Sequence, residues 1–150
     1  MMNAKKYLQQ IYKIDMIIQN KVIEKEQWQS MATSITAASD GERVQASGSQ
    51  QKMADAVVKY VELEDEIDRY IDLLIDTKKD IIRSIESLPA VEYDILHKVY
   101  IQYKDLYDVA AEYGKTYSWA TTAHGRALKH VQGILDERKK LQRLLKIEKE

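Results

Sequence analysis

The sequence contains no cysteine, and it has only one proline and five glycines in 150 residues. The absence of cysteine excludes a disulfide framework, a thiolate metal site and a cysteine nucleophile, and it fits a reducing cytosol. Proline and glycine are the residues that most often interrupt helices, whereas the abundant Leu, Ile, Lys, Glu, Gln and Ala favour them. The composition therefore predicts an all-α fold.

Long apolar runs and the usual enzyme motifs are also missing. No run approaches the ~20 apolar residues that span a bilayer, and Met1–Lys6 is not followed by an apolar signal core. There is no Gly-rich phosphate loop, nucleophile elbow or convincing carboxylate pair. His97, His124 and His130 share no face with metal-ligand spacing. We expect a soluble protein with no membrane contact, no enzymatic activity and no metal or other cofactor.

Charge is unevenly distributed, although the net charge is only -1. Between Met53 and Asp94, twelve acidic residues stand against five basic ones, a balance of -7. Between Lys115 and Ile147, eight basic residues stand against two acidic ones, a balance of +6. The C-terminal third can therefore attract phosphate while the middle repels it, although long exposed helices also carry solvated charge in such blocks.

The N-terminal half shows two helical patterns separated by a polar stretch. Apolar residues recur at three- and four-residue steps from Ala4 to about Met31, which predicts an amphipathic helix. The stretch 33–50 is rich in Ser, Thr and Gly and too small and polar to bury a core, so it predicts a mobile loop. A second, longer helix is expected from Gln51 to Glu86.

The second helix has coiled-coil spacing. Its seven-residue row contains Met53, Tyr60, Ile67, Leu74, Ile81 and Leu88. A row four residues further on contains Val57, Glu64, Ile71, Lys78 and Ile85, which predicts polar residues within the seam. Such a helix must bury its stripe, either as an antiparallel hairpin with the first helix or against a second copy of the chain.

Pro89 predicts a bend and a boundary between two regions, residues 1–88 and residues 89–150. Three further helices are expected, at about Ala90 to Gln102, at about Asp105 to Tyr113, and from Thr116 as far as Leu145. Gly133 weakens the last helix by about 1 kcal/mol relative to alanine and allows a break there.

The two helices on either side of Gly114 have the pattern of a helix-turn-helix. Glycine adopts the positive φ of a tight turn at no steric cost, and Thr116 supplies an N-cap for the second helix. The expected inner faces contain Leu106, Val109, Ala110 and Tyr113 on the first helix, and Ala120, Ala123, Ala127, Leu128 and Val131 on the second.

A family resemblance rests on these residues and their neighbours. They are Leu88-Pro89, Glu92, Ile95-Leu96, Tyr100, Leu106, Asp108-Val109-Ala110, Gly114, Thr116, Ala120, Ala123 and His124-Gly125-Arg126-Ala127-Leu128. The segment Leu88–Val131 resembles the helix-turn-helix of sigma-factor region 4. Together with 31–36 and 52–57, the 124–128 motif is similar to the ArpU/RinA-like group of phage and prophage transcriptional regulators of Gram-positive hosts, a similarity that covers nearly the whole chain.

The resemblance implies a set of DNA-binding residues in the second helix of the motif. Tyr117, Ser118 and Thr122 fall on the base-contacting positions. Trp119 and Thr121 stand where sigma factors commonly have phosphate-binding arginines, so the attraction to phosphate would come from Lys115, Arg126 and Lys129. Thr116 completes the set. An alternative for Trp119 is a packing anchor for a partner or for the long helix.

The function implied by the resemblance is sequence-specific binding of double-stranded DNA in the cytoplasm of a bacterial host. The chain would activate late genes of a phage or prophage through promoter DNA and host RNA polymerase. Its segment 4–88 would form a homo-oligomer or dock the polymerase. One alternative is a small-terminase-like DNA packaging protein, which a ring of eight or more subunits would favour. The other is a module that binds RNA polymerase without contacting DNA.

Overall fold

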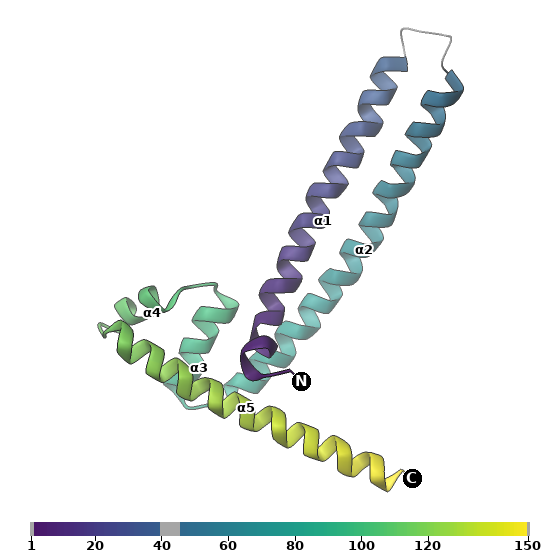
Figure 1. Cartoon of the computed structure of the whole chain (residues 1–150). Helices are drawn as coiled ribbons and strands as arrows, with labels where there is room; N and C mark the ends of the chain where they lie inside the picture. The colour runs from purple at the N-terminus through teal and green to yellow at the C-terminus, as the bar shows by residue number, and fades with distance from the viewer. Residues whose placement is uncertain (1, 40–45, 150) are drawn as a thin grey trace. The chain divides into compact units, whose positions relative to one another are not determined.

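The computed structural model describes residues 2–39 and 46–149, and their regular structure is entirely helical (Figure 1). The elements are α1 (Ala4–Ser39), α2 (Ala46–Glu86), α3 (Ala90–Leu96), the π-helical turn η1 (His97–Ile101), α4 (Leu106–Glu112) and α5 (Tyr117–Glu148). The predicted all-α class is confirmed. The bend expected at Pro89 is also present, because α2 ends at Glu86 and α3 begins at Ala90.

The predicted loop at 33–50 is wrong over most of its length. Helix α1 continues to Ser39, and α2 already begins at Ala46, while residues 40–45 lie outside the described residues. Serine and threonine cost only a few tenths of a kcal/mol relative to good helix formers, and adding a residue to an existing helix is far easier than starting one. Polarity alone therefore did not end these helices. Nor does Gly133 interrupt α5, which runs without a break.

The chain divides into two units. Residues 14–74 form one, here called the hairpin unit, and residues 1–13 and 75–150 form the other, here called the core unit. The sequence instead placed its boundary at Pro89, where one helix does give way to the next. The beginning of α1 and the end of α2 belong to the same unit as α3, α4 and α5.

In the hairpin unit, α1 and α2 run antiparallel and side by side (Figure 1). The row expected at Met53, Tyr60 and Ile67 faces inward, with Ile67 only 8% exposed. The second row is wrong within the hairpin unit, where Val57 and Ile71 are 47% and 39% exposed, whereas its last member, Ile85, is fully buried in the core unit. The inward row lies one residue earlier and contains Ala56, Leu63 and the half-buried Tyr70. Steps of three and four residues both fit a helical stripe, so the spacing alone does not choose between these two adjacent rows.

Two ion pairs join α1 to α2 in the hairpin unit. Lys21 Nζ lies 2.5 Å from Glu66 Oε2, and Lys25 Nζ lies 3.2 Å from Glu64 Oε1. Glu64 therefore forms an ion pair with Lys25 of α1 and is not a residue of the apolar seam. The hydrogen bond with Glu66 raises the pKa of Lys21, and the same bond lowers the pKa of Glu66.

The core unit joins three helices through a polar cluster around Tyr7. The Tyr7 hydroxyl donates to Asp80 Oδ2 at 2.5 Å and lies 2.9 Å from Ser84 Oγ. Arg138 donates to the Tyr7 hydroxyl at 3.3 Å and to Ser84 Oγ at 2.5 Å. Burial raises the pKa of Tyr7. These bonds tie the beginning of α1 and the end of α2 to the middle of α5.

Candidate nucleic-acid interface

A tight corner connects α4 to α5. Asp105 caps α4 by accepting a hydrogen bond from the Asp108 N–H at 2.9 Å. Gly114 has a φ of 62°, and the Lys115 N–H donates to the Ala110 carbonyl oxygen at 2.9 Å, the six-to-one bond of a helix C-terminal motif. Thr116 then caps α5 by accepting from the Trp119 N–H at 3.1 Å. The predicted conformation of Gly114 and the predicted cap at Thr116 are confirmed.

The inner faces of the two helices pack on α3. Ile95, Val109 and Ala123 form a buried cluster, against which Leu106, Tyr113 and Trp119 pack as partly buried side chains. Of the five residues predicted for the inner face of α5, Ala120, Ala123, Ala127 and Val131 are buried and Leu128 is half-buried. Three alanines on one face let α5 approach its neighbours closely, because an alanine side chain adds little volume. The corner is thus a rigid support for the first turns of α5.

Trp119 does not lie on the outward face of α5. It is half-buried against the cluster, and its ring centroid lies 5.1 Å from that of Tyr113. A large aromatic side chain in this position contributes mainly through the apolar area that it buries. Trp119 is therefore a packing residue and not part of the outward surface of α5.

Of the remaining candidate residues, Lys115 and Thr116 lie immediately before α5, and the others lie on its outward side. Thr121 is half-buried, and the others are exposed: Lys115, Thr116, Tyr117, Ser118, Thr122, Arg126 and Lys129. The hydroxyls of Thr121 and Thr122 both donate to the Ser118 carbonyl oxygen at 2.9 Å. Their donor capacity is used within the helix, so in this conformation each offers an acceptor to an outside group.

A pair of stacked tyrosines stands beside the start of α5. The rings of Tyr107 and Tyr117 are 4.0 Å apart between centroids and only 8° from parallel. Both side chains are exposed, at 65% and 43%. The sequence singled out Tyr117 but not Tyr107, since no spacing rule relates a residue in the first turn of α4 to one in the first turn of α5. Stacking fixes the direction of the Tyr117 ring before any partner binds.

Two of the cations near the corner are paired with acidic side chains. Lys98 pairs with Asp94 at 2.6 Å, and Lys104 pairs with Glu112 at 2.6 Å. Burial opposes ionisation of Asp94, but hydrogen bonds from Lys98 and Tyr113 outweigh it and lower the pKa of Asp94.

Within 2–39 and 46–149, no ion pair joins an acid to the other cations, Lys115, Arg126 and Lys129. Their charge remains available to a phosphate, because no neighbouring carboxylate competes for it.

Behind the corner, two histidines of α5 are engaged by side chains of α3 and η1. His124 Nε2 lies 2.8 Å from the Tyr100 hydroxyl, and burial lowers the pKa of His124 and raises the pKa of Tyr100 to about 12. His130 Nδ1 lies 2.5 Å from an oxygen of Glu92, which is 6% exposed. Among the described residues, no group of three His, Asp or Glu side chains has the arrangement of a metal site.

No protein-family model, curated protein or solved structure matches this chain. In the part of the chain that the structure describes, no helix has both the length and the apolar character needed to cross a membrane.

Proposed function

We propose that the outward face of α5 between Lys115 and Lys129 binds double-stranded DNA. The observation that carries this proposal is the corner itself: a glycine turn and a threonine cap present the first turns of α5 above a packed support. On that face, hydroxyls and uncompensated cations lie together. A helix presented in this way fits the major groove, where it can contact base edges.

Some of these residues position the helix on the DNA, and others recognise its base sequence. Lys115, Arg126 and Lys129 attract phosphates and position the helix, whereas Ser118 and Thr122 accept hydrogen bonds from base amino groups. Tyr117, held by its stack on Tyr107, lies at the beginning of the helix and meets thymine methyl groups or a phosphate. Three cations are few for a DNA-binding protein, so a single copy binds with modest affinity.

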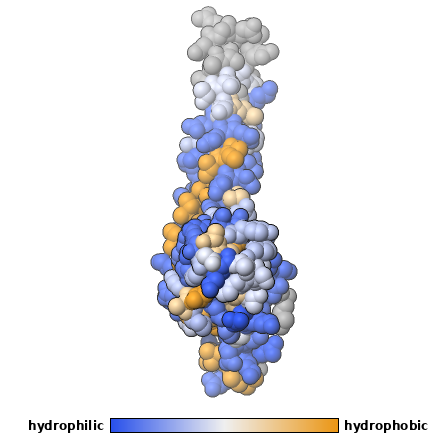
Figure 2. All heavy atoms as spheres, turned by 90° about the vertical axis from the view of Figure 1, so that its left-hand side faces the viewer, coloured by the Kyte–Doolittle hydropathy of each residue, from blue (hydrophilic) through white to orange (hydrophobic). Residues whose placement is uncertain are grey.

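The wider role follows from the resemblance in the sequence. The chain would be a phage or prophage regulator that activates late genes by placing RNA polymerase at a promoter. Exposed apolar residues on the hairpin unit support a docking or oligomerising surface there, and Figure 2 shows apolar side chains at the surface of the hairpin. They include Val57, Val58, Val61, Ile71 and Leu73. A second bound copy would double the number of phosphate contacts.

Salt dependence of DNA binding tests the proposal. A labelled mixed-sequence duplex of about 30 base pairs is titrated by fluorescence anisotropy between about 50 and 200 mM salt. The variant K115Q/R126Q/K129Q should lower the slope of log K against log salt by about 2.7 per bound copy, at ~0.9 for each lost phosphate contact.

The matched control removes three exposed cations from α2 as R69Q/K79Q/R83Q and should leave the slope unchanged. If both variants lower the slope equally, the protein binds DNA through overall charge and the proposed face is wrong. If the unmodified protein shows no duplex affinity at the lowest salt, the chain is not a DNA-binding protein.

Light scattering on the unmodified protein separates the packaging alternative. A monomer or dimer fits a promoter-binding regulator, because a half-site or a pair of half-sites needs one or two copies. A ring of eight or more subunits would instead favour a small-terminase-like function.

A further inference from the structure

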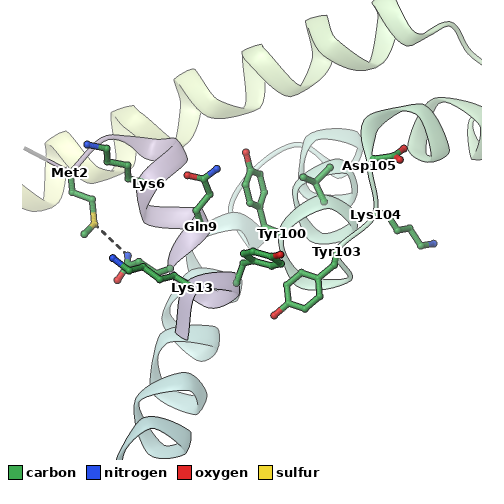
Figure 3. A pocket seen from close by; sticks show the side chains of 11 residues that line it. Met2, Lys6, Gln9, Lys13, Tyr100, Tyr103, Lys104 and Asp105 are labelled. Atoms are coloured by element: carbon green, nitrogen blue, oxygen red, sulfur yellow. Dashed lines mark hydrogen bonds between the residues drawn. The ribbon is translucent and has the colours of Figure 1, made fainter. Parts of the chain in front are cut away.

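A groove of about 780 Å³ lies in the core unit, away from the outward face of α5. Lys6, Gln9 and Lys13 come from the first turns of α1, and Tyr100, Tyr103 and Lys104 come from η1 and the segment that follows it (Figure 3). Its volume is within the roughly 300–1,000 Å³ of ordinary ligand pockets. No residue of this groove was singled out as a binding residue from the sequence.

Irregular backbone shapes the aromatic wall. Val99 and Tyr100 belong to the π-helical turn η1, a conformation that is rare and frequent at functional sites. Tyr103 has a φ of 60°, which residues other than glycine seldom adopt. This conformation places the Tyr103 ring against Tyr12, with 5.4 Å between centroids and 86° between planes. The two rings form one rim of the groove.

The groove carries a net positive charge that its own residues do not neutralise. Lys104 pairs with Glu112, and the single lining acid, Asp105, already accepts the capping bond of α4. Lys6 and Lys13 have no ion-pair partner among the described residues. They are seven residues apart on α1, which is about 10 Å along the helix axis. Two available ammonium groups therefore belong to the α1 side of a groove whose other side is aromatic and aliphatic (Figure 3).

We propose that this groove binds an extended acidic peptide of a partner protein. Two carboxylates four residues apart in an extended chain lie on the same face about 13 Å apart, a span that the flexible side chains of Lys6 and Lys13 can meet from positions separated by about 10 Å along α1. An aromatic or large aliphatic side chain between them would lie on Tyr100, Val99 and the Tyr103 rim. The positive charge attracts an acidic peptide and disfavours a basic one. The apolar wall buries the apolar side chain of the peptide.

The ring geometry favours a peptide over a single nucleic-acid strand. Strands bind by stacking successive bases on open aromatic faces along a track of cations. Here Tyr12 and Tyr103 meet edge to face, and Tyr100 is 8% exposed with its hydroxyl on His124. Tyr12 and Tyr103 are exposed, but their crossed planes do not form a series of parallel ring faces, while the two available lysines suffice for two carboxylates.

A defined peptide tests the proposal on the full chain. The probe is fluorescein-labelled Gly-Glu-Ser-Trp-Ser-Glu-Gly, whose two Glu and one Trp share a face in the extended conformation, and its anisotropy is followed at low salt. We expect a Kd below about 1 mM, and at least about tenfold weaker binding when both Glu are replaced by Gln or the Trp by Ala.

K6Q/K13Q should weaken binding of the acidic probe by about tenfold, whereas the charge-matched variant K139Q/K140Q should leave it within about twofold. Both variants change exposed lysines, and circular dichroism confirms that they fold. In NMR spectra, the probe should shift amides of residues 2–13 and 99–105 in the unmodified protein. K6Q/K13Q should keep the salt slope for duplex DNA, so loss of one binding activity does not imply loss of the other.

Four results would overturn the proposal. They are no binding up to about 1 mM probe, equal binding of the neutral peptide, equal loss in the two lysine variants, and tighter groove-dependent binding of a single-stranded oligothymidine. The last would assign the groove to nucleic acid.

Discussion

The two units bury their side chains to very different degrees. The largest side chains with essentially no exposure are Leu8, Ile11, Ile81, Ile85, Ile95, Leu96, Val109 and Val131, and all of them belong to the core unit. In the hairpin unit, Ile14, Leu63 and Ile67 each keep 8% exposure, and only the small Ala56 is buried more completely, at 1%. Two helices can bury only one seam, whereas five helical segments enclose a centre. The core unit therefore has its own hydrophobic core, and the hairpin unit depends on a thin seam and its ion pairs.

The largest expected effect is in the core unit, at Ile95. This side chain has no exposure and belongs to the cluster that supports α5. Ile95→Ala should lower the free energy of unfolding by about 2 to 5 kcal/mol, because it removes apolar contacts and leaves a cavity. Urea unfolding followed by circular dichroism measures the change. A loss below about 1 kcal/mol would show that the cluster collapses easily and is not the rigid support described above.

The matched change in the hairpin unit is Leu63→Ala, with a smaller expected loss of about 2 kcal/mol, at the lower end of the range for such substitutions. Its site faces a single seam and can collapse more readily. Hydrogen exchange should show faster exchange for amides in 14–74 and unchanged exchange for amides in 106–131. Equal acceleration in both ranges would mean that the two units unfold together and do not differ in stability.

Two glycines of the core unit should respond to alanine in opposite directions. Gly114 has a positive φ, so Gly114→Ala should cost about 1 to 2 kcal/mol, although no atom lies within 4 Å of the added Cβ. Gly133 lies inside α5 with open space around it, so Gly133→Ala should stabilise by about 0.4 to 1 kcal/mol. Thermal unfolding of both variants checks the signs. A stabilising Gly114→Ala would contradict the turn geometry.

The smallest effect concerns pH and His124. Burial lowers the pKa of His124 in the folded chain, so the unfolded chain binds more protons as pH falls below about 6.5, the ordinary histidine value. This contribution to stability is therefore full above that pH and decreases as pH falls toward the folded pKa. Unfolding free energies between about pH 7 and 5 should decline less in His124→Gln than in the unmodified chain. Identical slopes would exclude His124 as the cause.

Local signals in the sequence were sufficient to predict the corner between α4 and α5, but not how the helices pack. Gly114 and Thr116 act through their own backbone and hydroxyl, so their roles could be predicted without knowing the fold. The inward row of α2 could not be chosen, because Ala56 and Val57 both fit a helical stripe. The stack of Tyr107 on Tyr117 depends on how two helices meet.

The groove lined by Lys6 and Tyr103 could not be predicted from sequence patterns at all. Lys6 and Tyr103 are nearly a hundred residues apart in the chain and line one groove only because the beginning of α1 packs in the core unit. The positive φ of Tyr103 has no signature, since glycine or asparagine would be expected at such a position. Tertiary packing decides both features.

The most direct measurement is selection of bound duplexes from a library with a randomised central segment, followed by sequencing. The unmodified protein should enrich one recurrent motif, and S118A or T122A should weaken binding to that motif by about 1 to 3 kcal/mol per lost base contact. K139Q/K140Q should still enrich it. Failure of the unmodified protein to enrich any motif, or enrichment of the same motif with unchanged affinity by S118A and T122A, would contradict the proposal that the outward face of α5 recognises DNA sequence.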